Sequence, residues 1–282
     1  MTQGAVPVVV LAAALLHAVW NALVHGVRDR TAGLAQMNLV FVVFGVTLAL
    51  FVRPPGQAAL PYLLASTVLQ VGYQLLLVRA YGLGDFGQMY PIARGTSPAV
   101  VALLAATVLH RPPPAGQVAA VAVISLGLAG LTLAGGLPGP AQLPSTAAAL
   151  GSGVLIAGYT VVDAGGVRAA DSAAGYIAWM FLLQGLAVLA TVAVVRRRAL
   201  WPALREGRAV GLGGGLMSLT AYGLVVWAQT VGDLPTIAAL RETSIVIAAL
   251  IGALVLRERL GGLRLAASAT VLTGIALLEF AH

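Results

Sequence analysis

The chain has 282 residues, of which 60% are hydrophobic and only 9% are charged, and its mean hydropathy is +0.96. A soluble domain carries about 25% charged residues, so this composition excludes a soluble globular protein and indicates that the chain is dissolved in lipid. The net charge of +7 lies mostly in predicted loops, where it favours anionic lipid headgroups, and no loop interleaves basic and aromatic residues as a nucleic-acid interface would.

Apolar runs of about 20 residues, bounded by Gly, Pro and Arg, predict helices that cross a hydrocarbon layer of about 30 Å. We expect ten of them, which makes the protein all-α and multi-pass. In chain order the predicted spans are residues 5–24, 33–52, 58–78, 86–109, 117–135, 145–163, 173–195, 209–229, 234–256 and 263–280.

Two of these spans are near copies of each other, at a constant offset of 147 residues. Residues 94–109 and 241–256 each follow a Gly-Asp pair, and each begins with Arg. The identical pairs are Arg94/Arg241, Thr96/Thr243, Ser97/Ser244, Ala102/Ala249, Leu103/Leu250, Ala106/Ala253, Val108/Val255 and Leu109/Leu256.

This duplication predicts a five-helix repeat at 1–136, a linker at 137–144 and a second five-helix repeat at 145–282. Five is an odd number, so the second repeat is expected to insert upside down relative to the first. An inverted repeat of this kind is common in secondary transporters, with the solute site near the midplane.

Arg94 and Arg241 stand inside apolar spans, where a charge is costly and usually faces a solute path. Arg94 lies nine residues after Asp85, about 13 Å along a helix and therefore near the midplane. Pro91 and Pro98 predict an interrupted helix around Arg94. In the second copy Pro235 falls in the first turn, so we expect an unbroken helix there.

The arginines also have a purely structural interpretation. Each can form an ion pair with Glu242, with Asp163 or with a backbone carbonyl, and so lock the two halves of the chain together.

Polar residues recur at helical spacing in six spans, which pair across the repeat as first with sixth, third with eighth and fourth with ninth. We expect these spans to surround one polar cavity, although tyrosine and tryptophan also pack or anchor at interfaces. The candidate solute-binding residues are Trp20, Asn21, Tyr73, Gln74, Tyr81, Tyr90, Arg94, Ser97, Tyr159, Tyr222, Arg241 and Ser244. The candidates for carrying a coupling proton are His17, Asp163 and Glu242.

Signals of enzymes and metal sites are weak. Cysteine is absent, there is no GxSxG motif, and His17 and His25 do not form HExxH. The GxGxxG match at 82–87 lies between predicted membrane spans rather than in a βαβ unit. We therefore expect no enzymatic activity, no metal and no cofactor.

Several short motifs resemble the EamA branch of the drug/metabolite transporter superfamily. They are WN at 20–21, AY at 80–81, YPIAR at 90–94, ALRETS at 239–244 and LRERL at 256–260. The resemblance covers nearly the whole chain and implies ten helices in two repeats, with a cavity between spans 1, 3, 4 and 6, 8, 9. One position departs from it, because Arg111 stands in the first copy where Glu258 stands in the second.

The resemblance implies a secondary active transporter that moves a small polar metabolite, an amino acid or a similar solute that includes anionic ones, by proton coupling or exchange. We expect a monomer or homodimer in the cytoplasmic (inner) membrane of a prokaryote, in contact with anionic headgroups. Two alternatives stay open: a flippase for a lipid-linked substrate, and a membrane sensor or assembly subunit that transports nothing.

Overall fold

A computed structural model of the chain describes residues 5–25, 29–84, 86–108, 110, 112–133, 136, 139–197, 204, 208–247 and 261–279. At 21–25, 30, 86–88 and 279 it describes the backbone alone. These residues form helices, turns and short connections, and none of them lies in a β-strand. The expectation of an all-α protein is confirmed for this part of the chain.

Six helical segments are long and apolar enough to cross a membrane, so the protein is multi-pass. The six are Thr31–Ala49, Gln57–Leu83, Ala115–Leu133, Pro140–Ala169, Ala173–Arg196 and Arg208–Ala228. Two shorter apolar helices, Val6–Trp20 and Gly262–Leu278, accompany them.

The chain divides into two compact units, and each unit combines segments from both halves of the sequence. The first unit is Met1–Val71 with Val162–Val231, and the second is Gly72–Val161 with Gly232–His282. The boundary falls inside two long helices, α3 (Leu60–Leu83) and α7 (Leu143–Ala169), so each of them contributes to both units.

The first unit also contains α1 (Val6–His25), α2 (Arg30–Ala49), the 3₁₀ turn η2 (Gln57–Ala59), α8 (Ala173–Arg196) and α10 (Arg208–Ala228). The second unit also contains α4 (Phe86–Gly95), α5 (Ser97–Thr107), α6 (Ala115–Leu133), the 3₁₀ turn η3 (Pro140–Gln142), α11 (Leu234–Arg241) and α13 (Gly262–Glu279).

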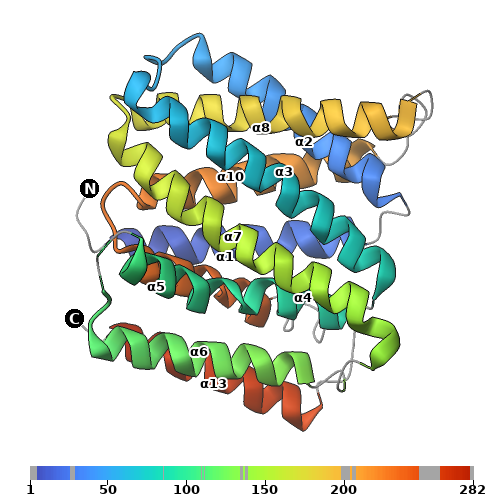
Figure 1. The fold of residues 1–282 in the computed structure, drawn as a ribbon, viewed down its shortest axis with the longest axis vertical. Helices are drawn as coiled ribbons and strands as arrows, with labels where there is room; N and C mark the ends of the chain where they lie inside the picture. Colours follow the sequence, from blue (N-terminus) through green and yellow to red (C-terminus); the bar gives the residue numbers. More distant parts are fainter. Residues whose placement is uncertain are drawn as a thin grey trace. The chain divides into compact units, whose positions relative to one another are not determined.

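Within the first unit, α2 and α8 lie side by side and run in opposite directions (Figure 1). Gly45 packs against the backbone of Ala178 and Leu182, while Gly185 packs against that of Asn38 and Val42. A Cβ atom on Gly45 would lie 2.8 Å from the Ala178 carbonyl, and one on Gly185 would lie 2.8 Å from the Asn38 carbonyl. The two contacts are reciprocal, at one offset of 140 residues.

The second unit repeats this arrangement with α6 and α13, which also lie side by side (Figure 1). A Cβ atom on Gly127 would lie 2.8 Å from the Val271 nitrogen, and one on Gly274 would lie 2.8 Å from the Ile124 nitrogen. Here the offset is 147 residues, the same as between the sequence copies. Small residues at such crossings let two helix backbones approach closely without lipid between them.

We expect Gly185→Ala to lower the free energy of unfolding by about 1–3 kcal/mol, because a methyl group there overpacks the α2–α8 crossing. Gly213→Ala in α10 is the matched control, since a Cβ atom there would meet no atom within 4 Å. Alanine favours a helix over glycine by up to about 1 kcal/mol, so the control should be at least as stable as wild type. Thermal unfolding in detergent measures both; equal melting temperatures for the two variants would contradict the packing argument.

Two predicted boundaries are wrong, and the helix interruption predicted around Arg94 is present. The spans at 58–78 and 145–163 continue to Leu83 and Ala169. The span at 86–109 is two helices, α4 and α5, separated by a turn at Thr96.

The helix break in the first copy follows from Pro98. Proline has no N–H, so it cannot donate to the carbonyl of Arg94 four residues earlier. Pro98 instead lies in the first turn of α5, where no such bond is needed. Pro91, in contrast, lies inside α4, which continues through it.

The prediction of an unbroken second copy is also wrong. The chain leaves the helix at Glu242 and becomes helical again over 243–247, without an interior proline. Ile245, which occupies the place of Pro98, donates its N–H to the Glu242 carbonyl at 3.0 Å. The rest of this span, 248–256, lies outside the described residues.

The two breaks share a threonine. The Thr96 hydroxyl donates to the Ile92 carbonyl at 2.8 Å, and that of Thr243 donates to the Leu240 carbonyl at 2.8 Å. Each hydroxyl bonds to the backbone of the helix just before the break, an interaction that bends helices. In both copies, the break comes directly after the helix that carries the arginine: α4 carries Arg94, and α11 ends at Arg241.

Candidate solute site

Two arginines from the two sequence copies lie in the second unit, and both are buried. Arg94 lies one residue before the end of α4, Arg241 is the last residue of α11, and each side chain is only about 4% exposed. A helix that ends inside the protein presents its last carbonyls and side chains to the interior rather than to the next helical turn. The breaks thus bring two guanidinium groups inside an apolar protein.

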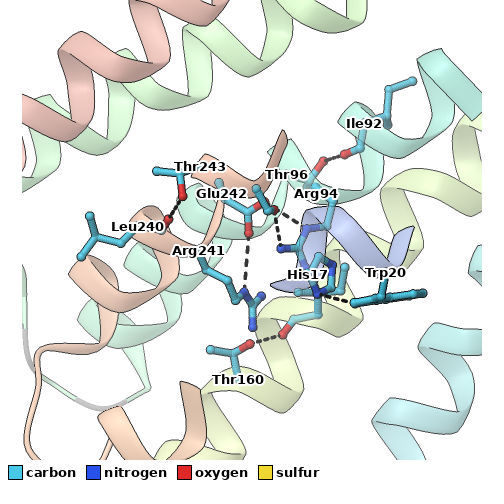
Figure 2. Close-up of polar contacts among 12 residues, drawn as sticks. His17, Trp20, Ile92, Arg94, Thr96, Thr160, Leu240, Arg241, Glu242 and Thr243 are labelled. Carbon is cyan, nitrogen blue, oxygen red and sulfur yellow. Dashed lines mark hydrogen bonds and ion pairs between the residues drawn. The ribbon is translucent and has the colours of Figure 1, made fainter. Parts of the chain in front are cut away.

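Glu242 lies between these arginines, as Figure 2 shows. Its Oε2 is 3.1 Å from Nε of Arg94, its Oε1 is 3.7 Å from Nε of Arg241, and the residue is fully buried. The structural alternative for the arginines, an ion pair with Glu242, is therefore present in the molecule. Two cations face one carboxylate, so these three residues carry a net charge of +1 when ionised.

The hydrogen bonds of this cluster are far from saturated. Nη2 of Arg94 donates to Oγ of Ser244 at 3.4 Å. Within the described residues, however, Nε and Nη2 of Arg241 donate no hydrogen bond. Buried polar groups are nearly always hydrogen-bonded, so these unused donors at a buried guanidinium are available to an acceptor other than the residues that the structure describes.

Three tyrosines lie near Arg94. Tyr73 on α3, Tyr90 on α4 and Tyr159 on α7 lie close enough to Arg94 to interact with its charge. The rings of Tyr73 and Tyr159 are in contact, with centroids 5.6 Å apart and planes inclined at 58°. These side chains place aromatic rings with polar hydroxyl tips near Arg94.

The close approach of α7 to the break in α4 depends on glycine. A Cβ atom on Gly153 would lie 2.6 Å from the carbonyl of Ala93 and 2.7 Å from Cβ of Thr96. Gly153 is thus a helix-packing site.

Four other candidate solute-binding residues belong to the second unit, and they differ in how deeply they are buried. Gln74, Ser97 and Ser244 are buried. Tyr81 is half-buried and packs against a small apolar core around Ala80, Met89 and Ala149.

The first unit contains a second buried carboxylate, Asp163 on α7. It accepts hydrogen bonds from the hydroxyl of Tyr176 on α8, at 2.8 Å to Oδ1, and from that of Tyr222 on α10, at 2.5 Å to Oδ2. Gly166 makes room for the Tyr176 hydroxyl, since a Cβ atom there would overlap it. Asp163 thus joins three helices of this unit.

Tyr176 was not among the candidate residues predicted from the sequence. It lies in a span without a polar stripe, so no helical periodicity marks it, and only the small residues Gly165 and Gly166 beside Asp163 hint at a close neighbour. Tyr222 was expected to bind solute; in this structure its hydroxyl donates to Asp163, and solute binding stays a prediction.

The remaining candidates come from α1. The indole nitrogen of Trp20 donates to Nδ1 of His17 at 3.3 Å, and the two rings meet edge to face with centroids 5.2 Å apart (Figure 2). This pair requires the His17 tautomer with its proton on Nε2. The side chain of Asn21 lies outside the described part of the structure.

Comparisons with known proteins agree with this architecture. The model of a family described as "EamA-like transporter family" matches residues 144–280. A solved structure described as "Crystal structure of protein" has a TM-score of 0.75 to the chain at 19% identity, over 99% of this chain and 98% of that one. At this identity the likeness concerns the fold alone. No curated protein matches the chain.

Proposed function

Since the chain belongs to the EamA-like transporter family, we propose that it is a secondary active transporter for a small polar metabolite, such as an amino acid or a similar solute. Membrane transport is what the family implies, and family members are transporters rather than enzymes. We further propose alternating access as the mechanism, and the cytoplasmic (inner) membrane of a prokaryote as the location.

The proposed architecture is a pair of inverted five-helix repeats, 1–136 and 145–282, joined by 137–144. The reciprocal glycine contacts support it, because each unit pairs one helix from each half of the chain in opposite directions. Helices related by a two-fold axis in the membrane plane run antiparallel and make such exchanged contacts.

The observation that carries the functional proposal is the buried cluster of Arg94, Glu242 and Arg241 at two helix breaks. A charge in a membrane helix is expensive and is retained where it serves a solute or ion path. Broken helices beside such charges are a recurrent form of transporter site. In this proposal Arg94 and Arg241 bind the polar group of the solute, and the three tyrosines contact its body.

Coupling is proposed to use a proton or exchange of solutes. Asp163 and Glu242 are buried carboxylates, and His17 is an imidazole whose hydrogen bond to Trp20 depends on its protonation state. Each of the three changes charge on taking up a proton. The protein is proposed to work as a monomer or homodimer whose arginine-rich loops meet anionic headgroups.

A binding screen followed by counterflow tests the function. Detergent-purified protein is first heated with amino acids, nucleosides, organic phosphates and quaternary amines, because a ligand of the native state raises the melting temperature. Vesicles containing the protein are then loaded with the stabilising solute, and uptake of the labelled solute is measured. Transient accumulation inside the vesicles is the expected result; binding without any accumulation would contradict transport.

A further inference from the structure

Among the residues that the structure describes in the second unit, the buried charge is unbalanced. Arg94 and Arg241 supply two positive charges against the single carboxylate of Glu242. The other carboxylate that the structure describes in this unit belongs to Asp233, which is exposed and caps α11 through the Thr236 N–H. The Asp233 carboxylate therefore caps the helix in solvent and does not neutralise the buried arginines.

Unpaired charge inside a protein is costly, because low polarity strengthens electrostatic interactions and removes hydration. A bound solute with one negative charge would bring the cluster to neutrality. A solute with two would leave it one negative charge in excess. The charge count of the residues therefore discriminates between ligand classes.

The unused hydrogen-bond donors of Arg241 also fit a ligand with one carboxylate. Nε and Nη2 of Arg241 are adjacent nitrogens of one guanidinium, buried and without a hydrogen-bond acceptor among the described residues. Two neighbouring N–H groups in this fork bind the two oxygens of a carboxylate. A cluster that served only to lock two helices would use these donors on Glu242, whose nearest oxygen is instead 3.7 Å from Nε.

We infer that the Arg94–Glu242–Arg241 cluster binds the carboxylate of a singly charged solute, and that Glu242 sets this preference by neutralising one of the two arginines. The inference rests on the proposed transport function and names its substrate class. Phosphate esters, which carry about −1.5 to −2 at pH 7, are disfavoured by the same charge count.

The test uses small probes of different charge: benzoate and acetate with one negative charge, phthalate with two, inorganic phosphate as a mixture of the mono- and dianion at pH 7, and neutral benzamide. Binding to purified wild-type protein is measured by calorimetry and by the shift in melting temperature. We expect benzoate to bind at least about tenfold more tightly than phthalate, the effect of one uncompensated buried charge, and benzamide not to bind.

Glu242→Gln keeps the shape of the side chain and raises the cluster charge to +2. The ratio of phthalate to benzoate affinity should rise by at least about tenfold. Glu242→Asp keeps the charge and should keep the wild-type ratio, even if both affinities change. Asp233→Asn removes an equal charge from the exposed cap of the same helix, where asparagine also caps well, and should change nothing.

An unchanged ratio in Glu242→Gln overturns the inference, as does tight binding of benzamide or no binding of any probe to wild type. Counterflow with the solute found by the screen separates this failure from failure of the proposed function. Transport of an uncharged solute would leave the function standing without the inference. Charge-selective binding without counterflow would leave the site standing without transport.

Discussion

Replacement of Arg94 by alanine is expected to abolish transport. The guanidinium lies beside Glu242, Ser244 and the tyrosines, and its loss removes one of the two cations proposed to hold the solute. We expect the transport rate in vesicles to fall by at least about 100-fold, equivalent to roughly 3 kcal/mol of lost interaction with a buried charged group.

The same change weakens the fold, because Glu242 then keeps Arg241 as its one described ion-pair partner. Removing one member of a buried ion pair costs about 3–5 kcal/mol when the other is left alone, and less where a second partner remains. The double variant Arg94→Ala/Glu242→Gln should recover part of that loss, since it no longer buries an under-compensated carboxylate.

Two variants sharpen the test. Arg79→Ala removes an exposed arginine of α3 in the same unit and should transport normally. Arg94→Lys keeps the charge but not the planar fork, so it should retain the fold and lose most of the affinity. Wild-type transport by a folded Arg94→Ala protein would make Arg94 structural.

Asp163→Ala is expected to be the most damaging single change in the first unit. It leaves the hydroxyls of Tyr176 and Tyr222 without the carboxylate that accepts from both. A hydrogen bond to a charged group contributes about 1.5–3 kcal/mol, so we expect a loss of about 3–6 kcal/mol in the free energy of unfolding. Denaturant unfolding in detergent measures this loss.

Asp163→Asn separates structure from coupling. Its amide oxygen can still accept one hydroxyl, so the stability loss should be smaller than for alanine. Asparagine cannot take up a proton, however. If Asp163 carries the coupling proton, this variant performs counterflow but no longer accumulates solute when a pH gradient is imposed.

Asp171→Asn is the matched control for that experiment, because Asp171 is an exposed carboxylate of the same unit. It should retain accumulation driven by the pH gradient. Gradient-driven accumulation by Asp163→Asn at the wild-type level would remove Asp163 from the coupling candidates and leave it as a link between three helices.

The sequence predicted the positions of the two buried arginines better than the residues that contact them. Hydropathy identifies spans because lipid accepts only apolar helices, and an arginine within a span is conspicuous against that background. The offset between Arg94 and Arg241 is likewise visible by simple alignment. Helix breaks were predicted from proline alone. This succeeded at Pro98, but α4 continues through Pro91, and a turn forms without proline at Glu242.

Tyr176 illustrates the limit of periodicity. A stripe of polar residues reports several side chains on one face, whereas a single tyrosine that reaches across to Asp163 leaves no pattern on its own helix. Tyr222 did belong to a stripe, but the stripe does not reveal whether its hydroxyl meets a solute or a neighbouring helix.

The sequence by itself determined that this chain is a helical membrane protein with two similar segments 147 residues apart, each with a cation inside an apolar span. These are properties of composition and of local order, and they depend only on which solvent surrounds the chain. The tertiary structure alone decided that Glu242 lies between both arginines, that Asp163 binds two tyrosines, and that glycines 140 or 147 residues apart exchange contacts. Such pairings join residues far apart in the chain, so they exist only once the helices have packed.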